Sequence, residues 1–507
     1  MAADPQMTLD ERLLGPVTNV ADFIWGGTWD GVEVLPFPPL AIVLLGAGLW
    51  FMIGLRFYPI TNLGSAVKNL FAGRKKGGAG EISPFAALST ALSGQVGTGN
   101  LAGVATAIAL GGPGAIFWMW VTALFGMALA FAEGALAIRY RETTSEGTYR
   151  GGPMSYIMMG LGPKWTWLAV FFCIGTLISG LVTGNAIQAN AVADGLNELF
   201  GIQEWLGGLI VAILVFIVII GGIKSIGRVA ESVVPIMALA YIVMAIIAII
   251  LNIQDIPETF GRIFGGAFNV QSASGGFVGA AVILAIRAGV ARGLFSNEAG
   301  QGSTPIAHAV AQTDDPEFQG RMAMLGTFID TIVICTMTAL VILTVEGNFS
   351  HAGQPVLHAW QADLDGFAVT SGAFAAAFPF AIGSIPLGTL VASLALLLFV
   401  FTTLLTWSYY GERAITFLYD RLKGSTREGE KKLHMVWRVL WCVVIFIGAA
   451  QPSELVWRLG DISNAAMALP NLLALALLSG VVFKLARGDR TAGKDHHADT
   501  PEEPEEY

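Results

Sequence analysis

The feature that most constrains this chain is a succession of long apolar segments, because a helix that spans a bilayer needs about 20 mostly apolar residues. Only 13% of the 507 residues are charged, against about 25% in soluble domains, so the chain could not cover a water-facing surface. We therefore expect an all-α integral membrane protein, in contact with the lipid bilayer, with eleven transmembrane helices. The segments run roughly over 37–57, 84–110, 114–138, 166–193, 206–222, 230–252, 276–300, 322–346, 381–410, 433–451 and 463–485.

The two ends of the chain fall outside these segments. Residues 8–30 have the pattern of an amphipathic surface helix. Its apolar members include Leu14, Val17, Phe23 and Trp25. The first residues are acidic and lack the basic start and early apolar stretch of a signal peptide, so we expect none. The tail from about Gly488 is polar and is expected to be disordered.

Lysine and arginine residues predict the orientation in the membrane, because they collect in cytoplasmic loops. If the first segment runs from outside to inside, 25 of the 28 basic residues fall on the inner side. This count places Arg287 and Arg292 at the inner end of the seventh segment. We expect a multi-pass protein of the plasma membrane (the inner membrane in a Gram-negative cell), with the N-terminus outside and the C-terminus in the cytoplasm.

The second apolar segment is a poor helix at its centre. Three glycines within six residues each cost about 1 kcal/mol against alanine, and unwound backbone in lipid needs internal partners. Such a break frees amides for a carboxylate and carbonyls for a cation. Close helix packing through small residues is the alternative, but packing does not require the neighbouring amides and hydroxyl. The candidate binding residues are Gly94, Gln95, Gly97, Thr98, Gly99 and Asn100.

The seventh segment is also interrupted, by two glycines and then by the polar run 296–302. Arg287, Arg292 and Glu298 are placed by the sequence in its inner half. Ionisable groups at such depth are costly unless they are paired or hydrated. We expect a structural or gating role for these three residues.

The two interrupted segments hold matching positions in two halves of the chain. Once the first segment is set aside, ten remain, and each half of five begins with a broken segment. Five is an odd number, so the halves have opposite topology, which is the pattern of an inverted-repeat transporter. The expected parts are an extracytoplasmic segment 1–36, an extra helix 37–57, a first repeat 84–252, a second repeat 276–485 and a cytoplasmic tail 486–507.

Two further segments carry polar groups that could face the breaks. Asn185 and Gln188 are spaced three residues apart, which predicts one shared helix face; interhelical hydrogen bonding is the alternative. In the ninth segment, Thr403 and Trp407 share one face, and Thr402 and Thr406 form the adjacent stripe.

A hydroxyl pair and main-chain carbonyls suit sodium, whereas threonine can instead bond to a carbonyl of its own helix. Trp407 could be a cavity wall or an anchor at the membrane interface.

The remaining ionisable and reactive residues do not form a catalytic motif, so we do not expect an enzyme. Asp330 and Glu133 are isolated intramembrane acids, either of which could relay a proton or ion, or form a structural pair. Cys173, Cys335 and Cys442 lie in apolar runs and are expected to be small core residues. No hydrolase, phosphate-loop or zinc motif is present, and no basic stripe predicts a nucleic-acid partner.

Several long runs resemble one known family. The stretches SGQVGTGNLAGVATAIALGGPGAIFWMW, GTYRGGPMSYI, GNAIQAN, ARGLFSNEAGQGS and TLLTWSYYGERA are similar to those of the alanine or glycine:cation symporters, also called the sodium:alanine symporter family. The runs occur in family order and cover roughly 40–485. The resemblance implies a LeuT-like 5+5 inverted repeat preceded by one extra helix, with two discontinuous helices. It also implies sodium-coupled uptake of alanine or glycine, with no organic cofactor.

The resemblance also implies roles for particular residues. The stretch from Gly94 to Asn100 would bind the substrate carboxylate, and sodium would sit between this break and the Thr402/Thr403 pair, with backbone carbonyls near Gly94 and Gly97. The family pattern has glycine where this chain has Thr406, so the local pocket differs here. Other residues lining the substrate pocket would be Asn185, Gln188, Phe295, Ser296, Asn297, Thr403 and Trp407.

Other functions stay open at this point. Proton coupling through Asp330 or Glu133 would give a second kind of symporter. A channel with a glycine-rich filter and a membrane-embedded enzyme are further alternatives, from different classes of protein. The sequence does not rank alanine against glycine, and it does not give the number of coupled ions or the oligomeric state.

Overall fold

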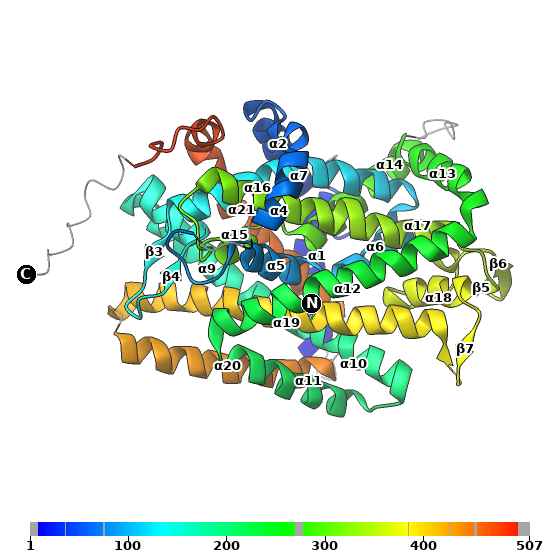
Figure 1. Cartoon of the computed structure of the whole chain (residues 1–507). Coiled ribbons are helices and arrows are strands. Elements are labelled where there is room, and N and C mark those ends of the chain that lie inside the picture. The colour runs from blue at the N-terminus through cyan, green and yellow to red at the C-terminus, as the bar shows by residue number, and fades with distance from the viewer. Residues whose placement is uncertain are drawn as a thin grey trace, which may run out of the picture.

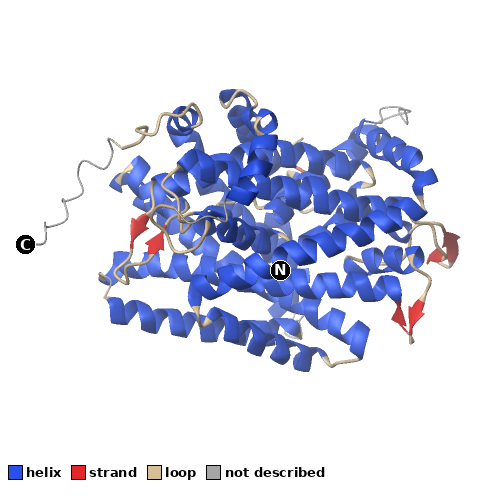
Figure 2. Ribbon diagram, in the orientation of Figure 1, coloured by secondary structure: helices blue, strands red, loops and turns tan. Residues whose placement is uncertain are grey.

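A computed structural model describes residues 9–494 except for 36, 73, 75–76, 269–276, 384, 425 and 451–453. Most of the described chain is helical, and the strands form four short antiparallel hairpins (Figure 2). The all-α architecture expected from the sequence is therefore confirmed.

The first half of the chain contains most of the short elements. They are α1 (Leu9–Gly26), β1 (Thr28–Trp29), β2 (Val32–Glu33), α2 (Pro39–Gly54), α3 (Tyr58–Thr61), α4 (Leu63–Ala72), α5 (Pro84–Gln95), η1 (Gly99–Gly103), α6 (Val104–Gly111), α7 (Gly114–Arg139), β3 (Glu142–Thr143), β4 (Tyr149–Arg150), α8 (Pro153–Tyr156), η2 (Ile157–Leu161), η3 (Pro163–Trp165), α9 (Thr166–Leu181), η4 (Val182–Ala186), α10 (Ile187–Phe200), α11 (Glu204–Ile219) and α12 (Gly222–Leu251).

The second half ends in three long helices. Its elements are η5 (Ile253–Asp255), α13 (Ile256–Phe268), α14 (Phe277–Asn297), α15 (Thr304–His308), α16 (Pro316–Thr327), η6 (Phe328–Cys335), α17 (Thr336–Thr344), β5 (Phe349–His351), β6 (Gln354–Val356), η7 (Ala359–Gln361), α18 (Phe367–Ala377), β7 (Ala381–Ile382), β8 (Ile385–Pro386), α19 (Leu387–Lys423), α20 (Arg427–Ala449) and α21 (Glu454–Leu485). The elements η1, η2, η4 and η6 are π-helical.

The long helices run side by side, and their connections gather at two opposite ends of the molecule (Figure 1). One end, which we call the α13 face, carries α13 and the hairpins β5–β6 and β7–β8. The other end, the β3–β4 face, carries the β3–β4 hairpin and the turn between α19 and α20. Helix α7 lies among α14, α16 and α21 and packs against all three.

Seven helices of the described chain are long and apolar enough to cross a membrane, and four shorter apolar helices accompany them. Large apolar side chains point outward from the outer helices; Ile217 of α11 is 63% exposed, and Ile236 and Leu239 of α12 are 70% and 64% exposed. In water this surface would be unfavourable, so the lateral surface is suited to lipid. The chain is built as a multi-pass membrane protein.

The predicted N-terminal helix exists, but its last turn is not a surface element. Helix α1 packs along α21, where the Trp25 indole is 5% exposed and donates to the carbonyl oxygen of Asp461 at 3.1 Å. The hydrophobic part of the amphipathic pattern therefore contacts protein.

The two arginines of the seventh segment lie close to acids of other helices. Arg287 pairs with Asp22 of α1 at 2.8 Å, and Arg292 lies 3.8 Å from Asp461 of α21. Both partners lie near Arg458, at the end from which α14 and α21 begin. Arg287 and Arg292 therefore lie on the α13 side of the helix break, and their place in the inner half of the membrane stays a prediction.

The tail prediction covers both described and undescribed residues. Residues 486–494 form turns, in which Arg490 pairs with Asp315 at 2.8 Å and the Thr491 carbonyl accepts from Arg139. The beginning of the tail is therefore attached to the helix bundle. Residues 495–507 lie outside the described part.

Candidate functional site

The second apolar segment breaks at its centre. Helix α5 begins with Ser83, whose hydroxyl caps the amide of Ala86 at 3.0 Å, and it ends at Gln95. Val96 is extended, and the chain continues through η1 into α6. The predicted interruption is thus present, and it lies in the buried interior, where freed backbone groups need partners.

Two glycines explain why the segment breaks where it does. A Cβ atom on Gly97 would lie 2.7 Å from Thr403 Oγ1 and 3.1 Å from Gln188 Oε1. A Cβ atom on Gly99 would lie 3.1 Å from Cδ1 of Phe295 and 3.1 Å from the Cα atom of Ser296. Only glycine lets the backbone approach α19, α10 and α14 this closely.

Two backbone amides at the break are bound by side-chain carbonyls. The Gly97 amide donates to Asn100 Oδ1 at 2.9 Å, and the Thr98 amide donates to Gln188 Oε1 at 3.3 Å. Gln188 Nε2 also donates to the Thr98 hydroxyl at 3.0 Å. The break therefore presents a pair of N–H donors to neutral amide oxygens, the arrangement that a carboxylate could replace.

The seventh segment breaks directly beside the first break. Helix α14 ends at Asn297, and Glu298 has φ 55°, in the left-handed region that is costly for a residue with a Cβ atom. Gly300 and Gly302 follow with φ 84° and 88° before α15 starts. Gln95 Nε2 donates to the Asn297 carbonyl at 2.5 Å, so the two breaks touch.

Asp330, which lies in η6 after helix α16, forms hydrogen bonds with residues of both breaks. Its carboxylate accepts from Asn100 Nδ2 at 2.7 Å, from Ser296 Oγ at 2.8 Å and from Thr331 Oγ1 at 2.7 Å. The residue lies in a π-helical stretch, a deformation that is frequent at functional sites. The sequence marked Asp330 only as an isolated acid, and its place between the two breaks was missed.

Helix α19 approaches the first break with Thr403. The Thr403 hydroxyl lies 3.2 Å from the Val96 carbonyl oxygen and 2.9 Å from that of Phe399, in its own helix. Because a hydroxyl has one proton, it can serve only one of these carbonyls at a time. Neutral oxygens from two segments therefore meet at this point.

The hydroxyls of the predicted Thr402/Thr403 pair point toward different helices. The Thr402 hydroxyl donates to Phe399 O at 2.9 Å and lies 3.8 Å from Met237 Sδ of α12. Thr406 instead faces α5, where its hydroxyl contacts the Ser93 hydroxyl and donates to Thr90 O at 3.1 Å. Of these three hydroxyls, that of Thr403 reaches the break, while that of Thr406 reaches helix α5 before the break.

Trp407 closes the site from α19. Its indole Nε1 donates to Glu298 Oε1 at 2.9 Å, and a Cβ atom on Gly184 would meet the indole at 2.5 Å. The side chain is 2% exposed. It is therefore a buried wall between α19, η4 and the second break, and not an anchor at the membrane interface.

Asn185 and Gln188 do not share a face in the structure. Gln188 reaches the first break, whereas Asn185 Nδ2 donates to the Trp441 carbonyl of α20 at 2.9 Å. The π-helical turn η4 ends at Ala186, between the two residues, and it changes the helical phase on which the prediction relied. Asn185 thus makes the interhelical hydrogen bond that was the alternative.

The third acid of the interior, Glu133 of α7, lies in a separate network. Its Oε1 accepts from Asn471 Nδ2 of α21 at 2.6 Å, and Asn471 also donates to the Gly300 carbonyl at 2.9 Å. Tyr156 donates to the other side of the same amide. Glu133 is therefore connected to the backbone of the second break through the Asn471 side chain.

A polar cavity of about 310 Å³ lies on the α13 side of the site. Asp22 of α1 pairs with both Arg287 and Arg458, at 2.8 Å and 2.9 Å. Below them, the Arg292 guanidinium lies 5.8 Å from the centre of the Phe295 ring, which itself lies 5.9 Å from the Trp457 ring. Arg292 thus lines the cavity and also contacts the Phe295 ring, which lies two residues before the end of α14.

Comparison with solved structures supports the fold. The structure of MhsT in complex with L-phenylalanine aligns with a TM-score of 0.55 at 15% identity, covering 83% of this chain and 93% of MhsT. At that identity the likeness shows the fold alone, a LeuT-type arrangement. The likeness and the paired helix breaks describe how the helices are arranged, and the class of protein follows from the sequence family.

Sequence comparison gives the family. The model of the sodium:alanine symporter family matches residues 28–501, and the chain belongs to this family. The sodium/alanine symporter AgcS of Methanococcus maripaludis is 41% identical over 469 residues, covering 92% of this chain and 95% of AgcS. The putative sodium/proton-dependent alanine carrier protein YrbD of Bacillus subtilis is 38% identical over 449 residues, covering 88% of each chain. The chain is therefore a cation-coupled amino-acid symporter, as the resemblance predicted.

Proposed function

We propose that this protein takes up alanine or glycine together with sodium by alternating access. The observation that carries the proposal is the contact between the two helix breaks through Gln95 and Asn297, with Thr403 against the first of them. The buried region where the two breaks meet thus contains backbone N–H donors, neutral oxygen atoms and a carboxylate. The names of the relatives AgcS and YrbD agree with an alanine carrier that depends on a cation.

The first break supplies the recognition of the amino-acid carboxylate. The amides of Gly97 and Thr98 are held by Asn100 and Gln188 at present, and a bound carboxylate would take over these donors. A charged acceptor makes such hydrogen bonds about twice as strong as a neutral one. The ammonium group would face oxygens of the second break, from Ser296 and Asn297.

Sodium would sit between the first break and α19. The Thr403 hydroxyl and the Val96 carbonyl supply two oxygens, and carbonyls near Gly94 and Gly97 complete the set. Thr402 remains part of the predicted pair, although its hydroxyl is turned toward α12. Ion and substrate would stabilise the same conformation, which is the thermodynamic basis of coupling.

The buried walls account for a preference for small substrates. Thr403 and Trp407 are 1% and 2% exposed, and Gln188 is 3% exposed, so these three side chains are shielded from solvent in this structure. Only a short side chain could fit beside the Trp407 indole without moving helix α19. Each face would open in turn while the other stays closed.

The proposal includes the predicted layout. An extra helix 37–57 precedes two five-helix repeats over 84–252 and 276–485, with the N-terminus outside and the C-terminus in the cytoplasm of a cell bounded by this plasma membrane. On that orientation the α13 face is extracellular, and the cavity at Arg287 lies on the entry route.

The substrate class is tested by sodium-dependent uptake of labelled alanine into proteoliposomes, with unlabelled amino acids as competitors. Alanine and glycine should compete strongly, while phenylalanine and glutamate should not. Gln188→Ala should lose uptake, and Asn185→Ala, which removes an amide turned toward α20, should retain much more of it. Strong competition by bulky amino acids would refute the small-substrate pocket.

A second candidate is coupling to protons through Asp330. Its carboxylate receives three hydrogen bonds from groups of both breaks, so a change in its charge would be felt at each. Replacing sodium with choline at fixed pH separates the two candidates: proton-driven uptake persists, and sodium-driven uptake stops. In the proton-coupled case, Asp330→Asn should also abolish the response to an imposed pH gradient.

A further inference from the structure

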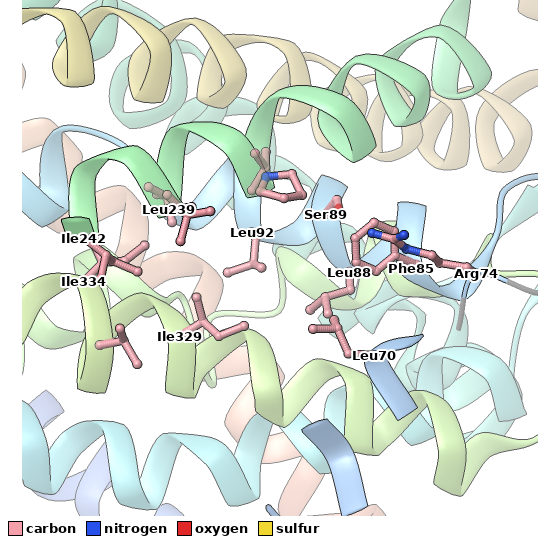
Figure 3. Close-up of a pocket in the computed structure, with 15 residues that line it drawn as sticks. Leu70, Arg74, Phe85, Leu88, Ser89, Leu92, Leu239, Ile242, Ile329 and Ile334 are labelled. Carbon is pink, nitrogen blue, oxygen red and sulfur yellow. The ribbon is translucent and has the colours of Figure 1, made fainter. Parts of the chain in front are cut away.

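An apolar groove of about 310 Å³ runs along the outside of the bundle (Figure 3). Helix α5 forms one side, α12 the second and η6 the third, and the end of the groove is bounded by Leu70 of α4 and by Arg74. The side chains of Leu92, Leu239 and Ile334 point into it from the three walls.

The groove opens toward the lateral surface of the protein. Leu239, on its rim, is 64% exposed, while Val96, on its floor, is fully buried. The lateral surface faces hydrocarbon in a membrane, where water does not fill apolar space. An empty groove would lose dispersion contacts along its whole lining, so a chain of methylene groups is the natural occupant.

Charge at one end of the groove selects among lipids. Arg74 is exposed, and its guanidinium lies 4.8 Å from the centre of the Phe85 ring, at the groove's mouth. A juxtamembrane arginine attracts anionic head groups with about 1 kcal/mol, and the fixed fork of a guanidinium matches a phosphate group. The groove and the charge therefore fit one molecule with an acyl chain and an anionic phosphate.

We propose that this groove binds an anionic phospholipid, with one acyl chain between α5, α12 and η6 and the head-group phosphate on Arg74. The site shares no lining residue with the cavity at Arg287, and it does not depend on which amino acid or ion is transported. Two contacts nevertheless connect it with the transport machinery.

The floor and one wall of the groove belong to the elements that carry the substrate site. The floor residue Val96 has its carbonyl oxygen 3.2 Å from the Thr403 hydroxyl. The wall residues Ile329 and Ile334 lie on η6, which presents Asp330 to Asn100 and Ser296 on its other side. A lipid in the groove would therefore hold both elements in this closed arrangement and shift the conformational equilibrium toward it.

Binding is tested with the purified full chain in phosphatidylcholine nanodiscs that contain a minority of phosphatidylglycerol carrying a photoreactive group near the chain end. Cross-links should map to peptides of α5, α12 and η6, and native mass spectrometry should count one retained phosphatidylglycerol. Soluble glycerol phosphate should not displace it, because the chain supplies part of the binding. Cross-links spread evenly around the bundle would overturn the proposal.

Two variants with matched controls locate the lipid. Arg74→Gln should weaken phosphatidylglycerol retention about fivefold, the equivalent of about 1 kcal/mol, while Lys68→Gln on the exposed side of α4 should not. Ala238→Phe fills the groove and should remove the cross-links, whereas Ala240→Phe, two residues along α12 and exposed, should leave them. Equal retention in Arg74→Gln and Lys68→Gln, or unchanged cross-links in Ala238→Phe, would refute the site.

A transport readout separates this site from the proposed function. If the lipid acts through Val96 and η6, adding phosphatidylglycerol to phosphatidylcholine vesicles should change the uptake rate of the wild type, and Ala238→Phe should abolish that response while Ala240→Phe keeps it. Binding without any effect on the rate would overturn the coupling but leave the binding site standing. Loss of alanine transport in all lipids would count against the proposed function alone.

Discussion

At the scale of single residues, the site depends on glycines, because side-chain oxygens of other helices occupy the space that a Cβ atom would need. Gly97 is the clearest case, because Thr403 Oγ1 occupies the space that a Cβ atom would need. The glycines could be recognised in the sequence as helix breakers. Their second role is to let side-chain oxygens of α19 and α10 approach the backbone, and this role is visible only in the structure.

Gly97→Ala should abolish transport, since the added methyl group would lie 2.7 Å from Thr403 Oγ1. The measurement is the initial rate of labelled alanine uptake in proteoliposomes. Gly103→Ala is the control in the same segment, because its Cβ atom meets nothing closer than 3.9 Å, and it should keep most of the activity. Normal transport by Gly97→Ala would show that the break does not need this close approach.

Thr403→Ala should raise the sodium concentration for half-maximal uptake about tenfold, which corresponds to about 1.4 kcal/mol for one lost oxygen ligand. Thr402→Ala should change it by less than about twofold, which is less than about 0.4 kcal/mol, because that hydroxyl contacts its own helix and Met237. The two values come from sodium titrations of uptake at fixed alanine. An equal effect of both substitutions would restore the pair that the sequence predicted.

At the scale of elements, π-helical turns determine which side chains meet. The sequence predicted Asn185 and Gln188 on one face from regular helical spacing, but η4 sends them to different neighbours. In the same way, η6 directs Asp330 to both breaks. Hydrophobic periodicity does not reveal such deformations. The helical segments could therefore be predicted from the sequence, but the directions in which their polar side chains point could not.

Helix α1 is held over the polar cavity by one carboxylate. Asp22→Asn removes the ion pairs with Arg287 and Arg458, each of which is partly exposed and worth up to about 1 kcal/mol. Hydrogen exchange of the α1 amides should therefore speed up about tenfold, the equivalent of about 1.4 kcal/mol. Glu33→Gln, at an exposed position of β2, is the control and should leave the exchange rates of α1 near those of the wild type; unchanged exchange in Asp22→Asn would contradict the anchoring role.

The loop before α5 carries a partly buried acid whose charge opposes folding. Burial raises the pKa of Glu81, although the Tyr149 amide donates to its carboxylate at 2.9 Å. A raised pKa means that the ionised form destabilises the folded state at pH values above the folded pKa, and that this penalty disappears as the pH falls below the ordinary value of about 4.3.

Glu81→Gln keeps the acceptor oxygen and removes the charge, so its Tm should exceed that of the wild type at pH 8. The difference should shrink as the pH approaches 4, where the wild-type carboxyl is protonated. Thermal unfolding in detergent across this range is the measurement. Glu346→Gln, at an exposed position, should show no such pH-dependent gain; a lower Tm of Glu81→Gln at pH 8 would mean that the nearby cations outweigh burial.

At the scale of the whole molecule, two distant parts of the chain come together to form one site. Length and apolarity of the segments were enough to predict an all-helical membrane protein, and the paired glycine-rich runs were enough to locate both breaks. Two features depended on tertiary contacts: the pairing of Arg287 and Arg292 with acids of α1 and α21, and the bridging role of Asp330. Neither partner is close in sequence, so no local pattern could have indicated it.

The central claim is that the joined breaks couple an amino acid to sodium. The most direct measurement is the accumulation of labelled alanine in proteoliposomes under an inward sodium gradient, with pH and membrane potential clamped. We expect alanine to rise above its equilibrium level with sodium and to stop at that level when choline replaces it. Accumulation that persists in choline, or uptake that never exceeds equilibrium, would contradict the account.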